Sequence, residues 1–179
     1  MNSSPKISLS FYKKIFFLLT ISLPFGAFAQ ETNYKSYSLF VYNFTKYMEW
    51  PGDRSGDFVI SVLGDSKIIS ELKNLASTKK VSGRPIIVKV VKDASELSDC
   101  HLLFISTAKS NQIKQVNEKF KGKPTLVVAE RDGLTKKGAG VDFFMDEDES
   151  LKFGLNQKEV ESHSIKVAGT LLKLAELVN

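Results

Sequence analysis

The sequence offers few side chains that could act as a nucleophile, a base or a soft metal ligand, since it has two histidines and one cysteine. Cys100 and His101 are adjacent in the phrase SDCHLLFIS, directly before an apolar run typical of a strand. Neighbouring strand residues point to opposite faces, which works against a shared metal ion or a nucleophile and base pair. His163 lies in the polar phrase ESHS, which favours a surface position or a helix start. We therefore expect neither histidine to be catalytic.

Other motifs that carry chemistry are missing from the sequence. There is no nucleophile elbow, no phosphate loop and no dinucleotide fingerprint. The glycine-rich phrase GLTKKGAG precedes a predicted strand, so it lacks the helix N-terminus that favours phosphate. The carboxylates of DEDES do not have EF-hand spacing, which indicates a solvated hairpin tip. We expect no enzymatic activity, no cofactor and no metal site, and keep an exported hydrolase only as a third hypothesis.

The single cysteine cannot form a disulfide within the chain. Because Cys100 precedes an apolar run, a small buried thiol is the simplest interpretation. A disulfide to a second chain is the alternative, although no cluster of basic residues flanks Cys100 to favour the thiolate.

Residues 1–29 have the pattern of a cleaved secretory signal peptide. Three lysines precede an apolar run from Ile15 to Leu23, and Ala27, Phe28 and Ala29 form a small-x-small cleavage signal. An uncleaved membrane anchor is the alternative, but the apolar run is shorter than the roughly 20 residues that span a bilayer. We therefore expect an exported protein whose single mature domain covers residues 30–179.

The basic character of the chain comes partly from this leader. Three of the 25 Lys and Arg residues lie in it, whereas all 20 acidic residues follow it, so the mature net charge is about +2. Such a balance gives no electrostatic reason to expect nucleic acid as a partner.

The mature sequence alternates apolar, β-branched runs with helical patterns. Strands are predicted at 58–63, 86–91, 101–106, 125–130, 141–145 and 151–155, with helical patterns between the first four. This alternation is typical of an α/β layered sandwich with a central, mostly parallel sheet and helices on both faces. The last two strands predict a C-terminal hairpin. The apolar spacing from Val160 to Val178 predicts a long C-terminal helix after it, interrupted near Ser162 to Ser164.

An aromatic stretch opens the domain, with seven aromatic residues among the seventeen positions from Tyr34 to Trp50. Spacings of three and four predict a helix that ends at about Glu49, with Tyr37, Val41, Phe44 and Met48 in the core. Trp50 precedes Pro51, which disfavours helical geometry. Because Tyr and Trp anchor many interfaces, we expect Tyr47, Trp50 and Pro51 to form a partly exposed contact surface for a partner.

Several phrases, in this order, resemble the YfiR/HmsC-like family over nearly the whole mature chain. They are YNFTKYMEWP, FVISVLGD, GRPIIVKVV, LSDCHLLFIS, TLVVAERDG, FFMDEDESLKFGLN and SIKVAGTLLKLAELV. The resemblance implies an α/β sandwich in the periplasm without catalytic activity. It also implies a regulator that restrains an inner-membrane diguanylate cyclase through its periplasmic region, lowering cyclic di-GMP and biofilm formation.

The resemblance further implies possible homodimers and, in some members, a response to redox conditions. Cys100 stands at a family cysteine position, but its partner and the later cysteine pair are absent, so disulfide sensing is not carried over. The membrane partner is expected to be a diguanylate cyclase or a sensor kinase. The alternative function is a small-molecule sensor or solute-binding module, with a crevice formed by the loops after Leu63, Val91 and Ser106.

Overall fold

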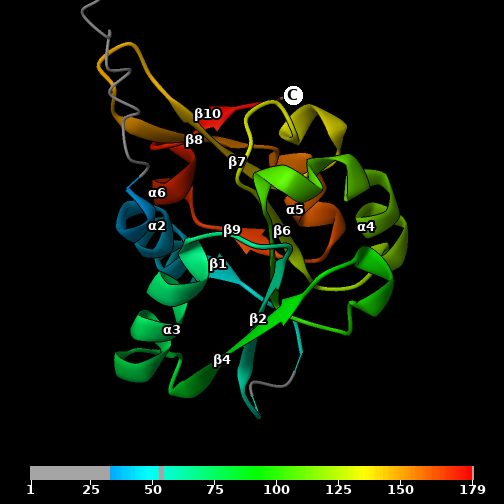
Figure 1. Ribbon diagram of the computed structural model, residues 1–179. Helices are drawn as coiled ribbons and strands as arrows, with labels where there is room; N and C mark the ends of the chain where they lie inside the picture. Colours follow the sequence, from blue (N-terminus) through cyan, green and yellow to red (C-terminus); the bar gives the residue numbers. More distant parts are fainter. Residues whose placement is uncertain (1–32, 53–54, 179) are drawn as a thin grey trace, which may run out of the picture. The chain divides into compact units, whose positions relative to one another are not determined.

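A computed structural model of the protein describes residues 33–52 and 55–178, and an eight-stranded sheet lies at its centre (Figure 1). The strands are β2 Phe58–Leu63, β3 Lys80–Val81, β4 Arg84–Val91, β5 Leu102–Ile105, β6 Leu126–Ala129, β7 Val141–Met145, β8 Leu151–Leu155 and β10 Glu176–Leu177. Their spatial order is β10-β8-β7-β6-β5-β2-β4-β3, and neighbours from β4 to β7 are parallel. The predicted α/β fold with a mostly parallel sheet is confirmed.

The central strands are buried on both faces, which explains their continuous apolar runs. All four residues of β5 and all four of β6 are buried. In β5, Leu102 and Phe104 belong to one apolar cluster, and Leu103 and Ile105 belong to another. The sheet therefore separates two layers of core, one on each face.

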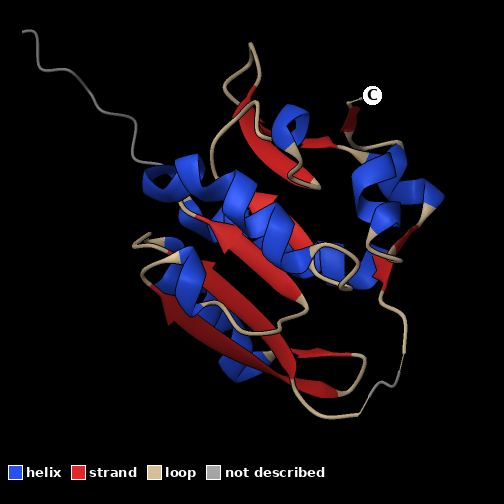
Figure 2. Cartoon of the chain, turned by 90° about the vertical axis from the view of Figure 1, so that its right-hand side faces the viewer, coloured by secondary structure: helices blue, strands red, loops and turns tan. Residues whose placement is uncertain are grey.

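Helices cover both faces of the sheet, as predicted (Figures 1 and 2). The helix α2 Tyr34–Tyr47 contacts α3 Ile68–Thr78, and both pack against the first apolar cluster. The helix α4 Ile113–Phe120 buries Ile113, Val116 and Phe120 in the second cluster. Short 3-10 turns connect the strands: η1 Ala94–Glu96, η2 Thr107–Gln112 and η3 Thr135–Lys137.

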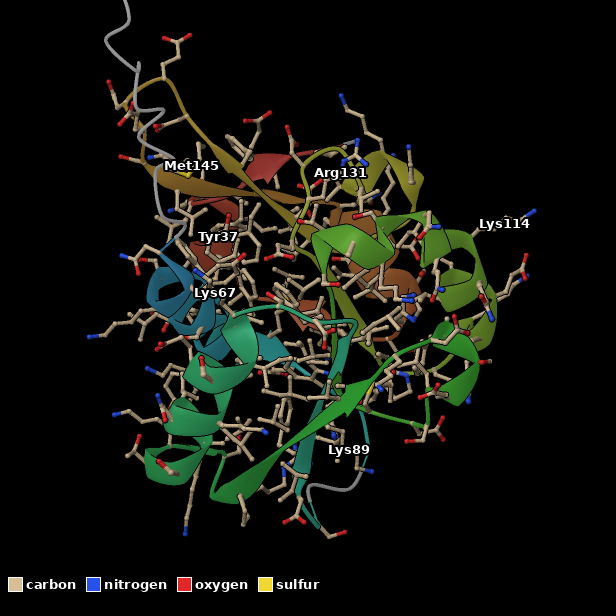
Figure 3. All side chains as sticks on the ribbon, viewed as in Figure 1. Tyr37, Lys67, Lys89, Lys114, Arg131 and Met145 are labelled. Atoms are coloured by element: carbon tan, nitrogen blue, oxygen red, sulfur yellow. The ribbon has the colours of Figure 1, made fainter. Side chains whose placement is uncertain are left out.

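The aromatic stretch forms the core-facing helix that its spacing predicts. Tyr37, Val41, Phe44 and Met48 are all buried, and Figure 3 shows Tyr37 directed toward the interior. The ring of Phe44 lies 6.1 Å from that of Phe143 and 5.2 Å from that of Phe153, centroid to centroid. The helix ends at Tyr47 rather than at Glu49, because Met48 and Glu49 form the short strand β1.

The predicted hairpin is confirmed, with the strand bounds that the sequence indicates, but β10 pairs with β8 and forms the edge of the sheet. Strands β7 and β8 pair antiparallel, and Phe143 lies opposite Phe153. At the tip, Asp146 accepts hydrogen bonds from the backbone N–H groups of Asp148 and Ser150. These bonds lower the pKa of Asp146, with Ser150 the largest cause. The acidic phrase is therefore a self-capped turn.

The predicted long C-terminal helix is wrong, but its predicted interruption near Ser162 to Ser164 is confirmed. The segment contains α5 Gln157–Ser162, β9 Lys166–Val167, α6 Gly169–Leu172 and β10. Asn156 caps the start of α5, and Ser164 has φ 59°, a left-handed conformation that stops a helix. Strand β9 then pairs antiparallel with β1, placing Val167 opposite Met48. Tertiary pairing with distant segments thus overrides the local helical spacing.

The predicted signal peptide lies outside the described residues, so its cleavage and the domain boundary at residues 29 and 30 stay predictions. Among the residues that are described, no helix combines the length and apolar character that a membrane span needs.

Candidate functional site

The end of α2 carries the residues predicted to contact a partner. Tyr47 is 40% exposed, Trp50 is half-buried and Pro51 is exposed, so the expected partial exposure of Tyr47 and Trp50 is confirmed. Their contact with a partner stays a prediction. Pairing of β1 with β9 fixes the backbone between Tyr47 and Trp50, and the N–H of Ala168 donates to the carbonyl of Tyr47 over 2.8 Å. The helix α2 and the pairing of β1 with β9 therefore hold the backbone that carries Tyr47 and Trp50.

Trp50 is anchored to the sheet through its indole. Its Nε1–H donates to the carbonyl oxygen of His101 over 2.8 Å, and its ring meets Phe58 edge to face with centroids 5.2 Å apart. The imidazole of His101 stacks on the same Phe58 ring, with centroids 4.7 Å apart. The guanidinium carbon of Arg84 lies 5.2 Å from the centre of Phe58. Trp50, Phe58, Arg84 and His101 thus form one cluster at the amino ends of β2, β4 and β5.

A cavity of about 310 Å³ opens beside this cluster, and we call it the amino-end cavity. Its lining comes from the end of α2 with β1 and Pro51, from the β3–β4 turn and from the start of β5. The lining residues are Thr45, Lys46, Met48, Glu49, Trp50, Pro51, Lys80, Val81, Ser82, Arg84 and His101. Two of the three residues predicted to bind a partner, Trp50 and Pro51, therefore also line a cavity.

The charge of the amino-end cavity is set by Lys46, Lys80 and Arg84 against Glu49. Burial and the nearby charge of Arg84 both lower the pKa of His101 below its ordinary value, burial being the larger cause. The Nδ1 atom of His101 accepts a hydrogen bond from the backbone N–H of Val59 over 3.0 Å. His101 is therefore neutral near pH 7, with its proton on Nε2.

Cys100 and His101 diverge, as the sequence predicts. Cys100 is buried in the apolar cluster on the face that α4 covers, whereas His101 lies against Phe58 and lines the amino-end cavity. Burial raises the pKa of the Cys100 thiol to about 11. Cys100 is a free, buried thiol that stays protonated at neutral pH.

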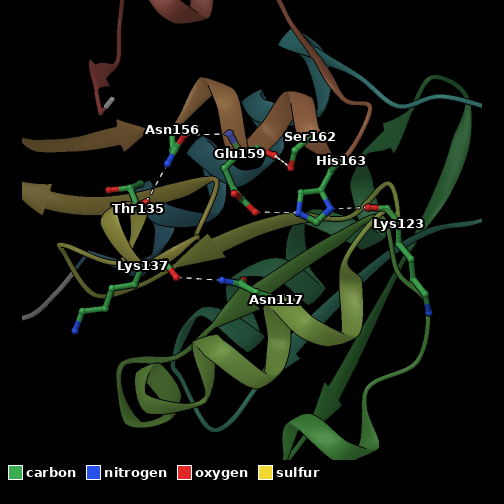
Figure 4. Close-up of polar contacts among 8 residues, drawn as sticks. All are labelled: Asn117, Lys123, Thr135, Lys137, Asn156, Glu159, Ser162 and His163. Carbon is green, nitrogen blue, oxygen red and sulfur yellow. Dashed lines mark hydrogen bonds and ion pairs between the residues drawn. The ribbon is translucent and has the colours of Figure 1, made fainter.

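His163 is not on the surface, contrary to the expectation from its polar neighbours. It is buried, with 6% of its surface exposed, and follows the last residue of α5. Its Nδ1–H donates to the carbonyl oxygen of Lys123 over 2.7 Å, and its Nε2 lies 3.2 Å from a carboxylate oxygen of Glu159 (Figure 4). The imidazole therefore joins α5 to the loop between α4 and β6.

A second cavity of about 620 Å³ lies between α4 and α5, beside His163. Asn117 belongs to its wall, and the side-chain amide of Asn117 donates to the carbonyl oxygen of Lys137 over 3.0 Å (Figure 4). The charged residues at its mouth include Lys114, which Figure 3 shows extending away from α4. This hollow is open and carries charges of both signs, so its lining favours no single ligand class.

The strand ends proposed as a crevice for the alternative function are occupied by protein side chains. Ser66 Oγ donates to Glu130 over 3.1 Å, and the backbone N–H of Thr107 donates to the same carboxylate over 2.6 Å. Gly64 has φ +85°, and a Cβ atom there would lie 2.4 Å from the hydroxyl oxygen of Ser106. Both cavities described above lie elsewhere on the molecule. The loops after Leu63 and Ser106 therefore pack against one another at the carboxyl ends of the strands.

The four basic and acidic residues of the amino-end cavity were missed at the level of sequence. Arg84 sits in the turn phrase SGRP, where an arginine before a strand carries no distinctive pattern. Parallel pairing of β4 with β2, and of β2 with β5, brings Arg84 beside His101. Within the described parts of the chain, no group of three or more His, Cys, Asp or Glu residues is placed to hold a metal ion.

Comparison with known proteins gives the family. A model of the YfiR/HmsC-like family matches residues 34–176, which covers α2 through the start of β10. The chain belongs to the YfiR/HmsC-like family. The resemblance inferred from the phrases of the sequence is thereby confirmed. Among curated proteins, the comparison found no match for this YfiR/HmsC-like chain.

One of the solved structures similar to this YfiR/HmsC-like protein is described as an ABC domain in complex with L-Trp from Streptococcus pneumonia. The two share 11% sequence identity with a TM-score of 0.46, over 68% of this chain and 55% of that chain. The present chain thus spans little more than half the length of that protein, and the likeness is too weak to support an argument.

Proposed function

We propose that this YfiR/HmsC-like protein is a non-catalytic periplasmic regulator that binds the periplasmic region of an inner-membrane signalling enzyme and restrains it. The partner is a diguanylate cyclase, or else a sensor kinase, and the effect is to lower cyclic di-GMP and biofilm formation. Family membership over residues 34–176 is the observation that carries the proposal. The signal-peptide pattern of residues 1–29 supports the periplasmic location.

The proposed contact surface consists of Tyr47, Trp50 and Pro51. Tyr47 is a large amphipathic side chain at the end of α2, and it is exposed although its neighbours Phe44 and Met48 are fully packed. Aromatic side chains on ordered backbone bind partners well because little conformational entropy is lost on association. Trp50 and Pro51 extend this surface to the rim of the amino-end cavity. Homodimer formation stays a prediction.

Complementation of a deletion strain tests the proposal. We expect deletion to raise cyclic di-GMP and biofilm, and the wild-type protein to restore both. Tyr47→Ala should fail to restore them, since it removes the proposed anchor without disturbing the core. Leu39→Ala is the matched control, because Leu39 is 49% exposed on the same helix but lies away from the proposed surface.

Equal amounts of each variant must be confirmed by immunoblot of the periplasmic fraction. If deletion leaves cyclic di-GMP unchanged, and membranes yield no cyclase or kinase bound to the wild-type protein, the proposed function is wrong. If deletion has its effect but Tyr47→Ala complements fully, the function stands and the contact surface lies elsewhere.

A further inference from the structure

Arg84 in the amino-end cavity has a buried donor, Nε, without an acceptor in the described part of the chain. A guanidinium carries five N–H donors and no acceptor. Its Nε atom is buried, and among the described residues it has no hydrogen-bond partner. The contact within reach is His101, whose Nε2 lies 3.3 Å from Nη1 of Arg84.

His101 cannot accept a hydrogen bond from Nη1 of Arg84. Its Nδ1 already accepts from the backbone N–H of Val59, which is a donor under all conditions. A neutral imidazole has one acceptor nitrogen, so Nε2 carries the proton and presents a second donor to Arg84. Protonation of the ring would not help, because an imidazolium has no acceptor at all. Two donors therefore face each other at the wall of the cavity.

An oxyanion would resolve this conflict. A carboxylate accepts two parallel hydrogen bonds from a guanidinium, and such charge-assisted bonds are stronger than neutral ones. The same group could accept from Nε2–H of His101, and Lys80 also lines the cavity. A carboxylate that accepts from Nη1 of Arg84 and from Nε2–H of His101 would replace the contact between two donors with two hydrogen bonds, so its binding is favourable.

The remaining walls indicate the rest of the ligand. Trp50, Met48 and Val81 provide apolar surface, and the volume of about 310 Å³ suits a small organic molecule rather than a polymer. Glu49 at the exposed rim disfavours a ligand with several negative charges. A monoanion with an apolar body fits these features better than a phosphate.

We propose that the amino-end cavity binds a small organic monocarboxylate, with the carboxylate on the guanidinium of Arg84 and the apolar body against the indole of Trp50. The inference goes beyond the proposed function, since it concerns an effector of the protein and not its membrane partner. It also places the small-molecule site at the amino ends of the strands, opposite the crevice expected from the loops after Leu63, Val91 and Ser106.

The sequence supplies a direct reporter, because Trp50 is its single tryptophan. Purified ¹⁵N-labelled protein is titrated with sodium benzoate and with acetate at constant ionic strength, and the indole N–H signal is followed by NMR. Benzamide is the neutral isostere of benzoate. We expect saturable shifts with benzoate, and at least about tenfold weaker binding of benzamide, as the loss of a charge-assisted bidentate contact implies.

Arg84→Gln should weaken benzoate binding at least about tenfold, and Lys114→Gln, in the other cavity, should leave it unchanged. Arg84→Lys keeps the positive charge but loses the planar guanidinium that binds a carboxylate through two hydrogen bonds, so it should also weaken binding. This variant is the substitute if Arg84→Gln does not fold. No saturable shift with benzoate or acetate would overturn the proposal. Equal binding of benzamide, or unchanged benzoate binding in a folded Arg84 variant, would overturn it as well. Neither result depends on cyclic di-GMP.

Discussion

At the position of His101, a backbone N–H and a guanidinium compete for one imidazole. The backbone donor of Val59 takes Nδ1, and burial with the charge of Arg84 keeps the ring neutral. The tautomer of His101 thus determines whether Nη1 of Arg84 meets an acceptor or a donor at the cavity wall. Substitutions here should show whether the neutral ring stabilises the fold.

We expect the protein to lose stability in mild acid because of His101. Its pKa is lowered in the folded state, so the unfolded chain binds a proton more readily as the pH falls below the ordinary value of 6.5. The stabilising effect of the neutral ring is complete above that value and declines as the pH falls toward the folded pKa. Urea unfolding at a series of pH values measures it.

His101→Asn, which keeps an acceptor for Val59 but does not titrate, should flatten that part of the pH profile. An identical pH dependence in wild type and variant would contradict the assignment.

Cys100 should be chemically silent in the folded protein. Its thiol is buried and its pKa is raised to about 11, so almost no thiolate is present at neutral pH. We expect Ellman's reagent to react slowly with native protein and rapidly in denaturant, and mild oxidants to leave the melting temperature unchanged. Rapid reaction of the native protein, or an oxidant-dependent dimer that Cys100→Ala abolishes, would show that the thiol is available for redox chemistry.

At the scale of elements, a buried carboxylate joins the glycine-rich loop to the hairpin. Asp142 of β7 accepts from both the N–H and the hydroxyl of Thr135, each over 2.9 Å. The side-chain amide of Asn156 donates to the carbonyl oxygen of Thr135 over 3.1 Å (Figure 4). The phrase GLTKKGAG is thus a structural turn, consistent with its lack of a helix N-terminus.

Asp142→Ala should therefore lower the free energy of unfolding by about 2–3 kcal/mol, since it leaves the donors of Thr135 buried without an acceptor. The effect is read from the midpoint of urea unfolding. Asp148→Ala at the exposed hairpin tip is the matched control and should change stability by less than about 0.5 kcal/mol. A similar loss of unfolding free energy in the two variants would show that the hydrogen bonds between Asp142 and Thr135 do not stabilise the fold.

Sequence predicted the elements well where their pattern is local. The bounds of β2, β7 and β8 agree with the predicted runs, and three of the four expected core residues lie on the buried face of α2, while the fourth, Met48, is buried in β1. The prediction for the C-terminal segment failed because β9 and β10 form only by pairing with β1 and β8. The amino-end cavity was missed for the same reason, since strand register rather than spacing brings Arg84 to His101.

At the scale of the whole molecule, β1 and β9 connect the start of the domain to its end. The N–H of Ala168 donates to Tyr47, and Ala168 has φ −68°, a value that proline also adopts. Ala168→Pro removes this bond and also points a ring carbon at the Tyr47 carbonyl oxygen, so the backbone of β1 and β9 must move apart there. We expect global stability to fall by more than about 1 kcal/mol, because the lost bond and the clash outweigh the reduced chain entropy.

The same variant should show faster amide exchange at residues 47–50 and a shifted indole N–H signal for Trp50, because the backbone there loses a constraint. Ala168→Ser keeps the N–H group and is the control. Unchanged exchange at residues 47–50 in the proline variant would mean that β1 is held by other contacts.

The pairing of β1 with β9 also has a consequence for the order in which the protein matures. The segment that carries Tyr47 and Trp50 is synthesised early, but its strand partner at Lys166 and Val167 follows near the end of the chain. Contacts between such distant residues form late in folding, because a long loop must close first. The surface proposed to hold a membrane partner would thus be finished only in a fully synthesised chain, so truncated or half-folded copies would not compete for that partner.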